Sequence, residues 1–337
     1  MIDILVAGGG PAGLSAAIRA ASAGLEAVVV EPRAAPVDKA CGEGIMPSGV
    51  AALRALGVTP AGRELRGIRY VEGRRQAEAV FRGSPGLGVR RTELHAALHR
   101  RAQELGVRVV TGRVAEVSQG QDSVTAAGLT ARWLIAADGL HSPLRRELGL
   151  ERGARAPRRY GLRRHYRIAP WTDFVEVHWS RHGEAYVTPV GEGLVGVAVL
   201  SRHRCSHEQH LAAFPALART LRGLEAGPVR GAGPLRQSAS APRAGRVLLA
   251  GDAAGYVDAL TGEGVALAAA TASAAVDCLV AGRPEAYPAR WARLTRRHRL
   301  LTGALLGAAG HPLTAGLIVP AAHRLPPLFD AAVRALQ

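Results

Sequence analysis

The sequence contains no asparagine and a single lysine, Lys39, although it is strongly basic. It has 43 basic and 27 acidic residues, a formal net charge of +16, and all but one of the basic residues are arginine. Lysine and asparagine have A-rich codons, whereas alanine, glycine, arginine and proline have G/C-rich ones. A GC-rich genome would produce this charge without selection for a polyanion, and we expect no nucleic-acid partner.

The few cysteines exclude two further classes of protein. Cys41, Cys205 and Cys278 are far apart and odd in number, and the sequence has no CxxC pair or Cys/His cluster. We therefore predict neither a disulfide framework nor a zinc site, and expect no metal. No charged segment followed by an apolar run and a cleavage site opens the sequence, so we predict no signal peptide and expect a cytoplasmic location.

The N-terminal pattern predicts a βαβ unit. Residues 2–7 and 26–31 are apolar runs typical of buried parallel strands, and the alanine-rich residues 11–23 between them favour a helix. Residues 132–137 and 246–250 are further apolar runs of the same type. We also predict strands at residues 107–111 and 114–118, and helices at residues 91–105, 207–224 and 264–280.

The pattern changes in the middle of the chain. Residues 68–82 predict a β-hairpin, and residues 157–201 contain short runs rich in valine, tyrosine and tryptophan, which predict an antiparallel sheet. We therefore predict an α/β fold in which a Rossmann-type domain carries an inserted antiparallel β-sheet substrate domain and C-terminal helices. The predicted bounds are 1–67, 88–156 and 240–285 for the first domain, 68–87 and 157–239 for the second, and 286–337 for the helices.

Three glycines follow the first strand with the spacing of a dinucleotide-binding turn. Gly8, Gly10 and Gly13 form a GxGxxG pattern, and Glu31 ends the next strand. The first glycine allows a tight turn, the second lets the backbone approach a pyrophosphate, and the third allows close packing of helix on sheet. Glu31 is placed to accept a hydrogen bond from a ribose hydroxyl. The pattern does not separate FAD from NAD.

Two aspartates end later strands of the same predicted sheet. Asp138 is followed by Gly139, Ser142 and Arg145, and Asp252 lies in a GDAAG segment that precedes a GEG turn. Ligands bind at the carboxyl ends of strands in open α/β sheets. Isolated aspartates also form turns and helix caps. The two residues therefore indicate a ligand site only in combination with the glycine pattern.

These three segments, taken in order, resemble the fingerprints of one flavoprotein superfamily. It includes p-hydroxybenzoate hydroxylase-like (group A) monooxygenases, geranylgeranyl reductases and flavin-dependent halogenases. The resemblance covers about residues 1–280. It implies FAD as the cofactor in a glutathione-reductase-like FAD-binding domain, with the adenine beside Val114 and the flavin ring beside residues 262–265. The implied cofactor-binding residues are Gly8, Gly10, Ala12, Gly13, Glu31, Arg33, Cys41, Arg91, Val114, Asp138, Gly139, Gly251, Asp252, Gly262, Gly264 and Val265.

The segment DKACGEG, residues 38–44, is most similar to the geranylgeranyl-reductase branch, whose members carry a CGxG segment beside the flavin. The resemblance implies that Cys41 and Gly42 are catalytic residues at the ring, although a small buried residue in a loop is the alternative. Tyr186 and His165, on predicted strands, are the other catalytic candidates. A phenolic substrate would need a basic group nearby, but strand alternation turns about half of such side chains away from the site.

The reaction is predicted from what the chain lacks. Residues 184–189 read EAYVTP, which keeps the proline of the reductase signature and loses its aromatic pattern; the halogenase WxWxIP motif is absent. Our first hypothesis is therefore a NAD(P)H-dependent flavin monooxygenase of secondary metabolism, hydroxylating a lipophilic aromatic or polyketide-type compound through a flavin hydroperoxide. The alternative is a geranylgeranyl-reductase-like reductase of a C=C bond in a prenyl chain. A non-catalytic nucleotide-binding protein is the alternative of another class.

Two further expectations concern partners. No second GxGxxG pattern is present, so NAD(P)H would dock transiently or a separate electron donor would serve. The C-terminal stretch of residues 300–323 has few charges. One prediction is a packed helical pair. The other is an apolar lid or interfacial surface for a lipophilic substrate, with Arg296, Arg297 and Arg299 facing anionic lipid. The sequence leaves the oligomeric state undetermined.

Overall fold

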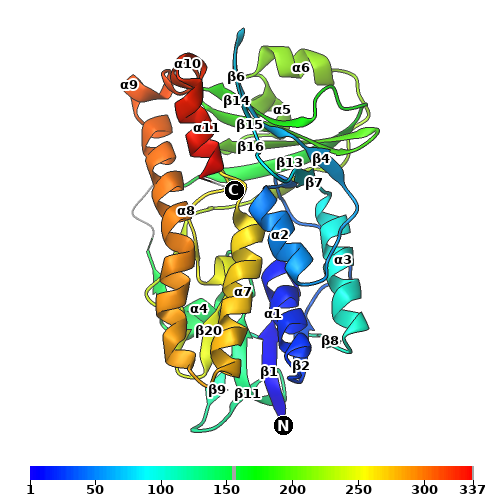
Figure 1. Ribbon diagram of the computed structural model, residues 1–337, viewed down its shortest axis with the longest axis vertical. Helices are drawn as coiled ribbons and strands as arrows, with labels where there is room; N and C mark the ends of the chain where they lie inside the picture. Colours follow the sequence, from blue (N-terminus) through cyan, green and yellow to red (C-terminus); the bar gives the residue numbers. More distant parts are fainter. Residues whose placement is uncertain (154–156, 336–337) are drawn as a thin grey trace.

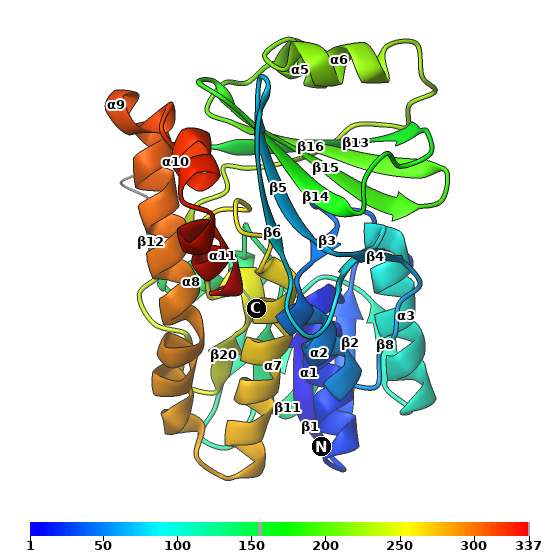
Figure 2. The same ribbon diagram turned by 45° about the horizontal axis from the view of Figure 1, so that its top comes forward.

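The structure is a computed structural model that describes residues 1–153 and 157–335. A largely parallel sheet with its helices occupies one end of the molecule, and a seven-stranded sheet occupies the other (Figures 1 and 2). The predicted domain boundary at residue 156 lies outside the described residues, as does the end of the predicted C-terminal segment.

The first sheet is built on the predicted βαβ unit. β1 pairs in parallel with both β2 and β11, and β2 and β11 in turn pair in parallel with β8 and β20. Every residue of β2 is buried, which explains its continuous apolar run. In spatial order the strands are β19 (Arg243–Ala244), β20 (Val247–Leu249), β11 (Leu129–Ala136), β1 (Ile2–Ala7), β2 (Ala27–Glu31) and β8 (Arg108–Thr111), while β10 (Val124–Ala126) and β9 (Ser118–Gln119) extend from β11.

One strand prediction is wrong. Residues 112–117 form no strand, and only Ser118–Gln119 pairs, as β9. The physical reason is the topology: β8 lies at one edge of the sheet, whereas the hairpin of β9 and β10 lies beside β11. The chain must cross several strands between them, so the intervening residues have no ladder partner although Val114 is buried.

Helices rich in small residues pack beside the parallel strands. α1 (Pro11–Ser22) contacts both α7 (Gly264–Val280) and α3 (Arg91–Glu104), and α2 (Pro47–Ala55) contacts α7. Alanine-rich faces allow these helices to approach closely, and their side chains share one core with Ile4 and Val29 of the sheet. The short α4 (Pro143–Glu147) and the 3-10 turns η1 (Gly251–Ala253) and η2 (Pro284–Ala286) complete this part.

The second sheet has seven strands, and its neighbours are antiparallel except for the parallel pair β14 and β5. Two three-stranded sheets connect it to the rest, one of β3 (Gly44–Ile45), β7 (Gly86–Gly88) and β4 (Arg63–Leu65), the other of β12 (Glu151–Arg152), β18 (Gln237–Ala239) and β21 (Gly255–Tyr256). The seven strands, in order, are β17 (Arg230–Ala232), β13 (Tyr160–Arg167), β16 (Leu194–Ser201), β15 (Gly183–Gly191), β14 (Phe174–Ser180), β5 (Gly67–Glu72) and β6 (Arg75–Val80).

The helix predicted at residues 207–224 is wrong in its length. Two short helices occur instead, α5 (His207–Leu211) and α6 (Pro215–Leu221). Pro215 has no amide hydrogen to donate and its ring clashes with the preceding turn, so it begins a new helix rather than continuing the first. Leu211, Leu217 and Leu221 pack against the valine-rich side of the sheet.

The C-terminal helices bridge the two ends of the molecule (Figure 2). α8 (Tyr287–Gly310) contacts α7, and α10 (Ile318–Arg324) and α11 (Pro326–Arg334) contact β6, with α9 (Pro312–Ala315) at the end of α8. Val319 and Phe329 are buried there against side chains of the seven-stranded sheet. The arrangement of a Rossmann-type sheet, an inserted antiparallel sheet and C-terminal helices confirms the predicted fold class.

Candidate cofactor and active site

The three glycines after β1 have distinct spatial roles. Gly8 has a φ of +100°, and a Cβ there would lie 2.5 Å from the carbonyl oxygen of Ala137. A Cβ on Gly13 would lie 1.8 Å from the carbonyl oxygen of Gly8. A Cβ on Gly10, by contrast, would meet nothing within 4 Å. Gly8 and Gly13 are therefore required by the fold, whereas Gly10 leaves open space at the N-terminus of α1, where a pyrophosphate is favoured.

Glu31 at the end of β2 is held as a carboxylate. One oxygen accepts from the Gly9 amide at 2.8 Å, and the other accepts from Nε of Arg33 at 2.6 Å. Burial raises the pKa of Glu31, but the hydrogen bonds from Arg33 and Gly9 lower it more, so the pKa lies below its ordinary value. A cavity of about 290 Å³ adjoins Glu31, Arg33 and His95. An ionised acceptor beside a cavity of this size is what a ribose hydroxyl needs.

Lys39 and Arg91 lie close to each other and form no ion pair within the described residues, whereas the neighbouring Arg33 pairs with Glu31. The Nζ of Lys39 comes within 3.4 Å of where a Cβ on Gly139 would be. Burial lowers the pKa of Lys39, and the neighbouring Arg33 and Arg91 lower it further. One guanidinium nitrogen of Arg91 is buried and has no hydrogen-bond partner among the described residues. Such an orphaned donor in a cationic setting fits a phosphate-bearing ligand.

Arg145 links the segment that contains Asp138 to the segment that contains Asp252. Its side chain is fully buried, and it donates to the carbonyl oxygens of Ala253 at 3.0 Å and of Leu140 at 3.1 Å. The guanidinium therefore ties the segment after β11 to the GDAAG segment after β20. Asp138 accepts from the Leu144 amide with one oxygen, while its other oxygen is buried and lacks a partner in the described part of the chain.

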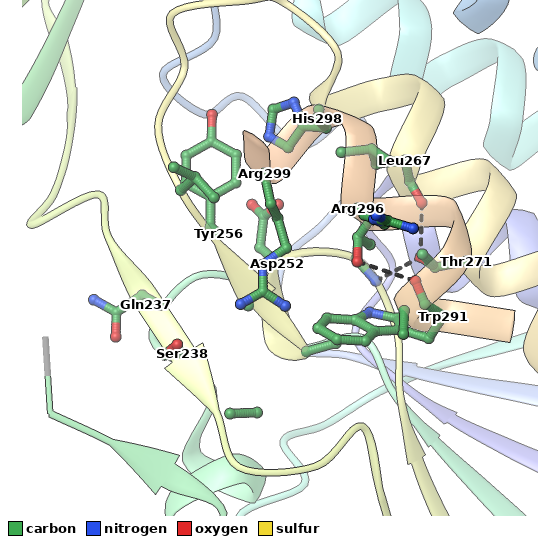
Figure 3. A pocket seen from close by; sticks show the side chains of 18 of the residues that line it. Gln237, Ser238, Asp252, Tyr256, Leu267, Thr271, Trp291, Arg296, His298 and Arg299 are labelled. Carbon is green, nitrogen blue, oxygen red and sulfur yellow. Dashed lines mark hydrogen bonds between the residues drawn. The ribbon is translucent and has the colours of Figure 1, made fainter. Parts of the chain in front are cut away.

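Asp252 follows β20 in a turn that Gly251 makes possible, because Gly251 has a φ of +59° and donates its amide to Thr271 Oγ1 at 3.0 Å. Burial raises the pKa of Asp252, while Lys39 and Arg91 oppose that shift. Figure 3 shows Asp252 lining a cavity of about 500 Å³ whose opposite wall carries Trp291 and other side chains of α8.

The CGEG segment, residues 41–44, and the LTGEG segment, residues 260–264, meet at their glycines. Gly262 has a φ of +70°, and a Cβ there would lie 3.2 Å from Cε of Met46 and 3.7 Å from the carbonyl oxygen of Gly44. The Gly42 carbonyl accepts from Oγ1 of Thr188 on β15 at 2.8 Å. Glu263 lies 2.8 Å from Nδ1 of His298 on α8. Thr188 on β15 therefore fixes the CGEG loop, and His298 on α8 fixes the LTGEG loop beside it.

A cluster of buried charged residues contacts Glu43 of the CGEG loop. Glu43 has a φ of +62°, a strained conformation for a residue with a side chain. Its carboxylate accepts from the Arg91 amide at 2.8 Å and lies 2.7 Å from Nε2 of His165. Arg163 lies 3.1 Å from the other ring nitrogen of His165 and pairs with Asp38. These contacts hold Glu43 in this conformation.

Residues 1–178 match the sequence profile of a family described as an FAD binding domain. The chain belongs to this FAD-binding family. It is 33% identical over 302 residues to the menaquinone reductase of Mycobacterium tuberculosis, covering 78% of this chain and 72% of that protein. It is 30% identical over 298 residues to digeranylgeranylglycerophospholipid reductase 2 of Methanopyrus kandleri, covering 78% and 73% of the two chains. The chain is thus an FAD-dependent oxidoreductase.

Solved structures support the same fold. A flavoprotein/dehydrogenase from Cytophaga hutchinsonii superposes with a TM-score of 0.85 at 18% identity, covering 99% of this chain and 92% of that one. A geranylgeranyl bacteriochlorophyll reductase-like protein from Thermoplasma acidophilum superposes with a TM-score of 0.79 at 21% identity, covering 99% and 95%. These similarities, together with the relatives, confirm the superfamily that the sequence motifs resemble.

The residues fit FAD along one path over the parallel sheet. Gly10 and the N-terminus of α1 would receive the pyrophosphate, Glu31 the adenosine ribose, and Asp252 the ribityl chain. The orphaned donor of Arg91 and the open space at Gly10 are the observations that support this fit. When bound, FAD supplies two-electron transfer to or from a substrate. The cofactor-binding roles inferred for these residues, as for Arg33, Val114 and Val265, stay predictions.

The structure gives the four catalytic candidates supporting contacts. The hydroxyl of Tyr186 donates to the Leu260 carbonyl at 3.1 Å, and burial raises its pKa well above the ordinary value. The sulfur of Cys41 accepts from the Glu43 amide at 3.4 Å, and burial raises the thiol pKa, so Cys41 stays a neutral thiol. His165 supports Glu43, and Gly42 accepts from Thr188. Their predicted catalytic roles remain predictions.

Sequence reasoning missed Glu43 and a second buried cluster. Arg159 pairs with Glu184 at 2.5 Å and with Asp258 at 3.1 Å, all three buried. Burial raises the pKa of Asp258 to about 6, against the opposing effect of Arg159. A signal existed in the sequence: Arg159, Arg163 and His165 interrupt a strand region at even spacing, which places charged groups on one face of the sheet.

Proposed function

We propose that the chain is an FAD-dependent reductase of a C=C bond in the polyprenyl chain of a lipid or quinone. The observation that carries the proposal is the similarity, over 78% of the chain, to proteins named menaquinone reductase and digeranylgeranylglycerophospholipid reductase. The substrates in both names carry polyprenyl chains. The monooxygenase hypothesis rests on the lost aromatic pattern around Tyr186 and on a fold shared with solved structures of lower sequence identity. The named relatives therefore make the reductase our first hypothesis and the monooxygenase our second.

The surroundings of the two glycine loops support an apolar substrate. Met46, next to the CGEG loop, and Leu260, the first residue of the LTGEG loop, belong to one buried apolar cluster with Trp179 and Tyr186 of the seven-stranded sheet. Tyr70 stacks edge-on against Trp179, with ring centroids 5.2 Å apart. An isoprene unit has no polar group, so it needs shape and exclusion of water rather than hydrogen bonds.

The chain's own residues would fix the geometry of the reaction rather than supply its electrons. Saturating a C=C bond adds two electrons and two protons; a positioned hydride donor supplies both electrons and one proton, and the second proton must come from an acid or from solvent. Thr188 and Glu43 hold the CGEG loop, and Tyr186 holds the backbone of the LTGEG loop at Leu260. The raised pKa of the Cys41 thiol argues against a thiolate nucleophile. NAD(P)H or a separate protein donor would return the electrons.

Product analysis tests the proposal. The purified flavin-loaded protein is reduced with dithionite and incubated anaerobically with menaquinone, and the extracted lipid is analysed by fragment-resolved mass spectrometry. The proposal expects a product heavier by two hydrogen atoms, located in the prenyl chain. A parallel incubation with oxygen and NADPH uses aromatic and polyketide compounds. A product that has gained one oxygen atom there, with no saturated prenyl product in the anaerobic arm, would establish the monooxygenase hypothesis instead.

A further inference from the structure

Exposed apolar side chains are concentrated in the C-terminal helices. Eleven large apolar residues are exposed in the described part of the chain, and six of them fall between residues 294 and 328. They are Leu294, Leu300, Leu313, Leu317, Leu325 and Leu328. Leu313 is 78% exposed and Leu317 is 58% exposed, at the end of α8 that lies beside α9 and α10 (Figure 1). Single exposed leucines need no explanation, but six of them within the C-terminal helices do.

Positive charge is concentrated in the same segment. Residues 286–337 contain seven arginines and one acidic residue, Asp330, so they carry six of the chain's sixteen net positive charges. Arg293, Arg296, Arg297 and Arg299 are all exposed on α8. No ion pair of these four arginines occurs within the described residues. The composition of the whole chain explains arginine in general, but not the near absence of acidic residues here.

The helices are amphipathic in space as well as in sequence. Val319 and Ala322 of α10 and Phe329 and Val333 of α11 face inward, in the apolar cluster that also holds Met46, Tyr186 and Leu260. Leu317, Leu325 and Leu328 of the same segment are exposed and lie outside this cluster, on helices that cover the proposed substrate site. No single helix in the described ranges is long and apolar enough to span a membrane; residues 284–310 and 313–324 pass only as a pair bent by 111°.

We propose that the outer face of α8–α11 docks on an anionic lipid bilayer. Leucine side chains would enter the acyl region while the arginines contact lipid phosphates, as in interfacial helices. A second copy of the chain is the weaker occupant, because two such faces would bring like charges together. The proposal rests in part on the proposed function, since a polyprenyl lipid resides in the bilayer that this face would contact.

The cavity beside Asp252 continues this face toward the cofactor site. Figure 3 shows Arg296 and Arg299 of α8 on its wall, and the 63% exposed Leu300 also lines it. Arg299 stacks over the ring of Trp291, 5.5 Å from its centroid. The inner wall includes Asp252 and Gly264. Helix α8 therefore contributes both to the docking face and to a cavity that reaches the cofactor loops. A lipid taken from the bilayer at this face would have a short path to that cavity.

Vesicle flotation tests the proposal with the full-length, flavin-loaded protein. Vesicles of phosphatidylcholine alone are compared with vesicles containing phosphatidylglycerol. We expect flotation with the anionic vesicles, weakened by salt. The Arg296→Gln/Arg297→Gln variant should lower the partition coefficient roughly 30-fold, since an arginine near an anionic surface contributes about 1 kcal/mol. The Leu313→Gln/Leu317→Gln variant should lower it about tenfold or more.

Matched variants control for general charge and hydrophobicity. Arg54→Gln/Arg100→Gln removes two exposed arginines elsewhere, and Val229→Gln/Val280→Gln removes two exposed apolar side chains elsewhere. Both should float like the unmodified protein. Absence of flotation, or equal loss in test and control variants, overturns the proposal, as does a dimer in vesicle-free solution that the Leu313→Gln/Leu317→Gln variant abolishes. Flotation without prenyl reduction rejects only the proposed function, whereas reduction of a short soluble prenyl substrate without flotation rejects only the docking.

Discussion

The imidazole Nε2 of His165 lies 2.7 Å from Oε2 of Glu43, in the buried space between β13 and the CGEG loop. The contact joins the seven-stranded sheet to the loop that the family resemblance places at the flavin. Glu43 also receives the amide of Arg91, the first residue of α3. One carboxylate thus links the seven-stranded sheet to the first turn of α3 at the candidate site.

Replacing Glu43 with glutamine should destabilise the protein and loosen the cofactor. Arg163 and His165 would keep their buried places without the negative charge between them, which costs about 3 kcal/mol for a broken buried pair. The measurement is urea unfolding of the apoprotein, together with FAD titration by fluorescence quenching. The exposed Glu64→Gln serves as the control and should shift stability by less than about 0.5 kcal/mol. Equal effects of the two substitutions would contradict the role of Glu43.

Alanine at Gly10 and at Gly13 should separate cofactor binding from folding. A Cβ at Gly10 meets open space in the protein, so Gly10→Ala should unfold like the unmodified apoprotein yet bind FAD much more weakly. A Cβ at Gly13 would lie 1.8 Å from a backbone oxygen, so Gly13→Ala should lose several kcal/mol or fail to fold. Urea unfolding measures the stability of each variant, and FAD titration measures its cofactor affinity. Normal FAD affinity in Gly10→Ala would show that the pyrophosphate lies elsewhere.

Arg145 should tolerate no conservative replacement. Lysine keeps the charge but cannot donate to Leu140 and Ala253 at the same time, and it leaves those carbonyls unsatisfied. We expect Arg145→Lys to lose about 3 kcal/mol of unfolding free energy, by the cost of leaving buried groups unpaired. The adjacent Arg146, which makes one exposed bond to the His141 carbonyl, provides the control Arg146→Lys. Thermal or urea unfolding that shows no difference between them would refute this assignment.

His95 should make the apoprotein less stable in mild acid. Its ring contacts the Gly9 carbonyl, and burial together with Arg91 lowers its pKa to about 4. In the unfolded chain its ordinary pKa near 6.5 applies, so the unfolded state binds the proton first as pH falls. Stability should therefore be fully present above pH 6.5 and fall by about 2 kcal/mol between pH 7 and 5 through this residue.

The His95→Gln variant isolates that contribution. Its unfolding free energy should change less between pH 7 and 5 than that of the unmodified protein, by the same margin. His99→Gln, four residues further along α3, is the matched control and should keep the full pH dependence. An identical pH dependence in the unmodified protein and in His95→Gln would exclude His95 as its source.

The fold was largely predictable because strong local patterns specify it. The apolar run of residues 2–7 and the alanine-rich residues 264–280 coincide with β1 and α7 as the structure has them. The failures occur where tertiary context decides. Residues 114–118 have strand composition but serve as the crossing from β8 to β9, and Pro215 splits a helix whose apolar spacing seemed continuous.

The candidate site was predictable only where a motif carries chemistry. Gly10 and Asp252 follow from strand ends and glycine spacing. Glu43 does not, because its importance comes from His165 and Arg91, which lie 122 and 48 residues away in the sequence. Asp258 and Glu184 are likewise joined by Arg159 only in three dimensions. No local pattern encodes these pairings, since they depend on how the two sheets meet.

The most direct test of the central claim is anaerobic reoxidation of the bound flavin. The dithionite-reduced, flavin-loaded protein is mixed with a geranylgeranyl lipid that has no quinone ring, and flavin absorbance is followed by stopped flow. The same lipid with fully saturated chains is the matched control. A prenyl reductase predicts reoxidation by the unsaturated lipid and none by the saturated one. Flavin that stays reduced with both lipids, and reoxidises only when oxygen is admitted, would contradict the account.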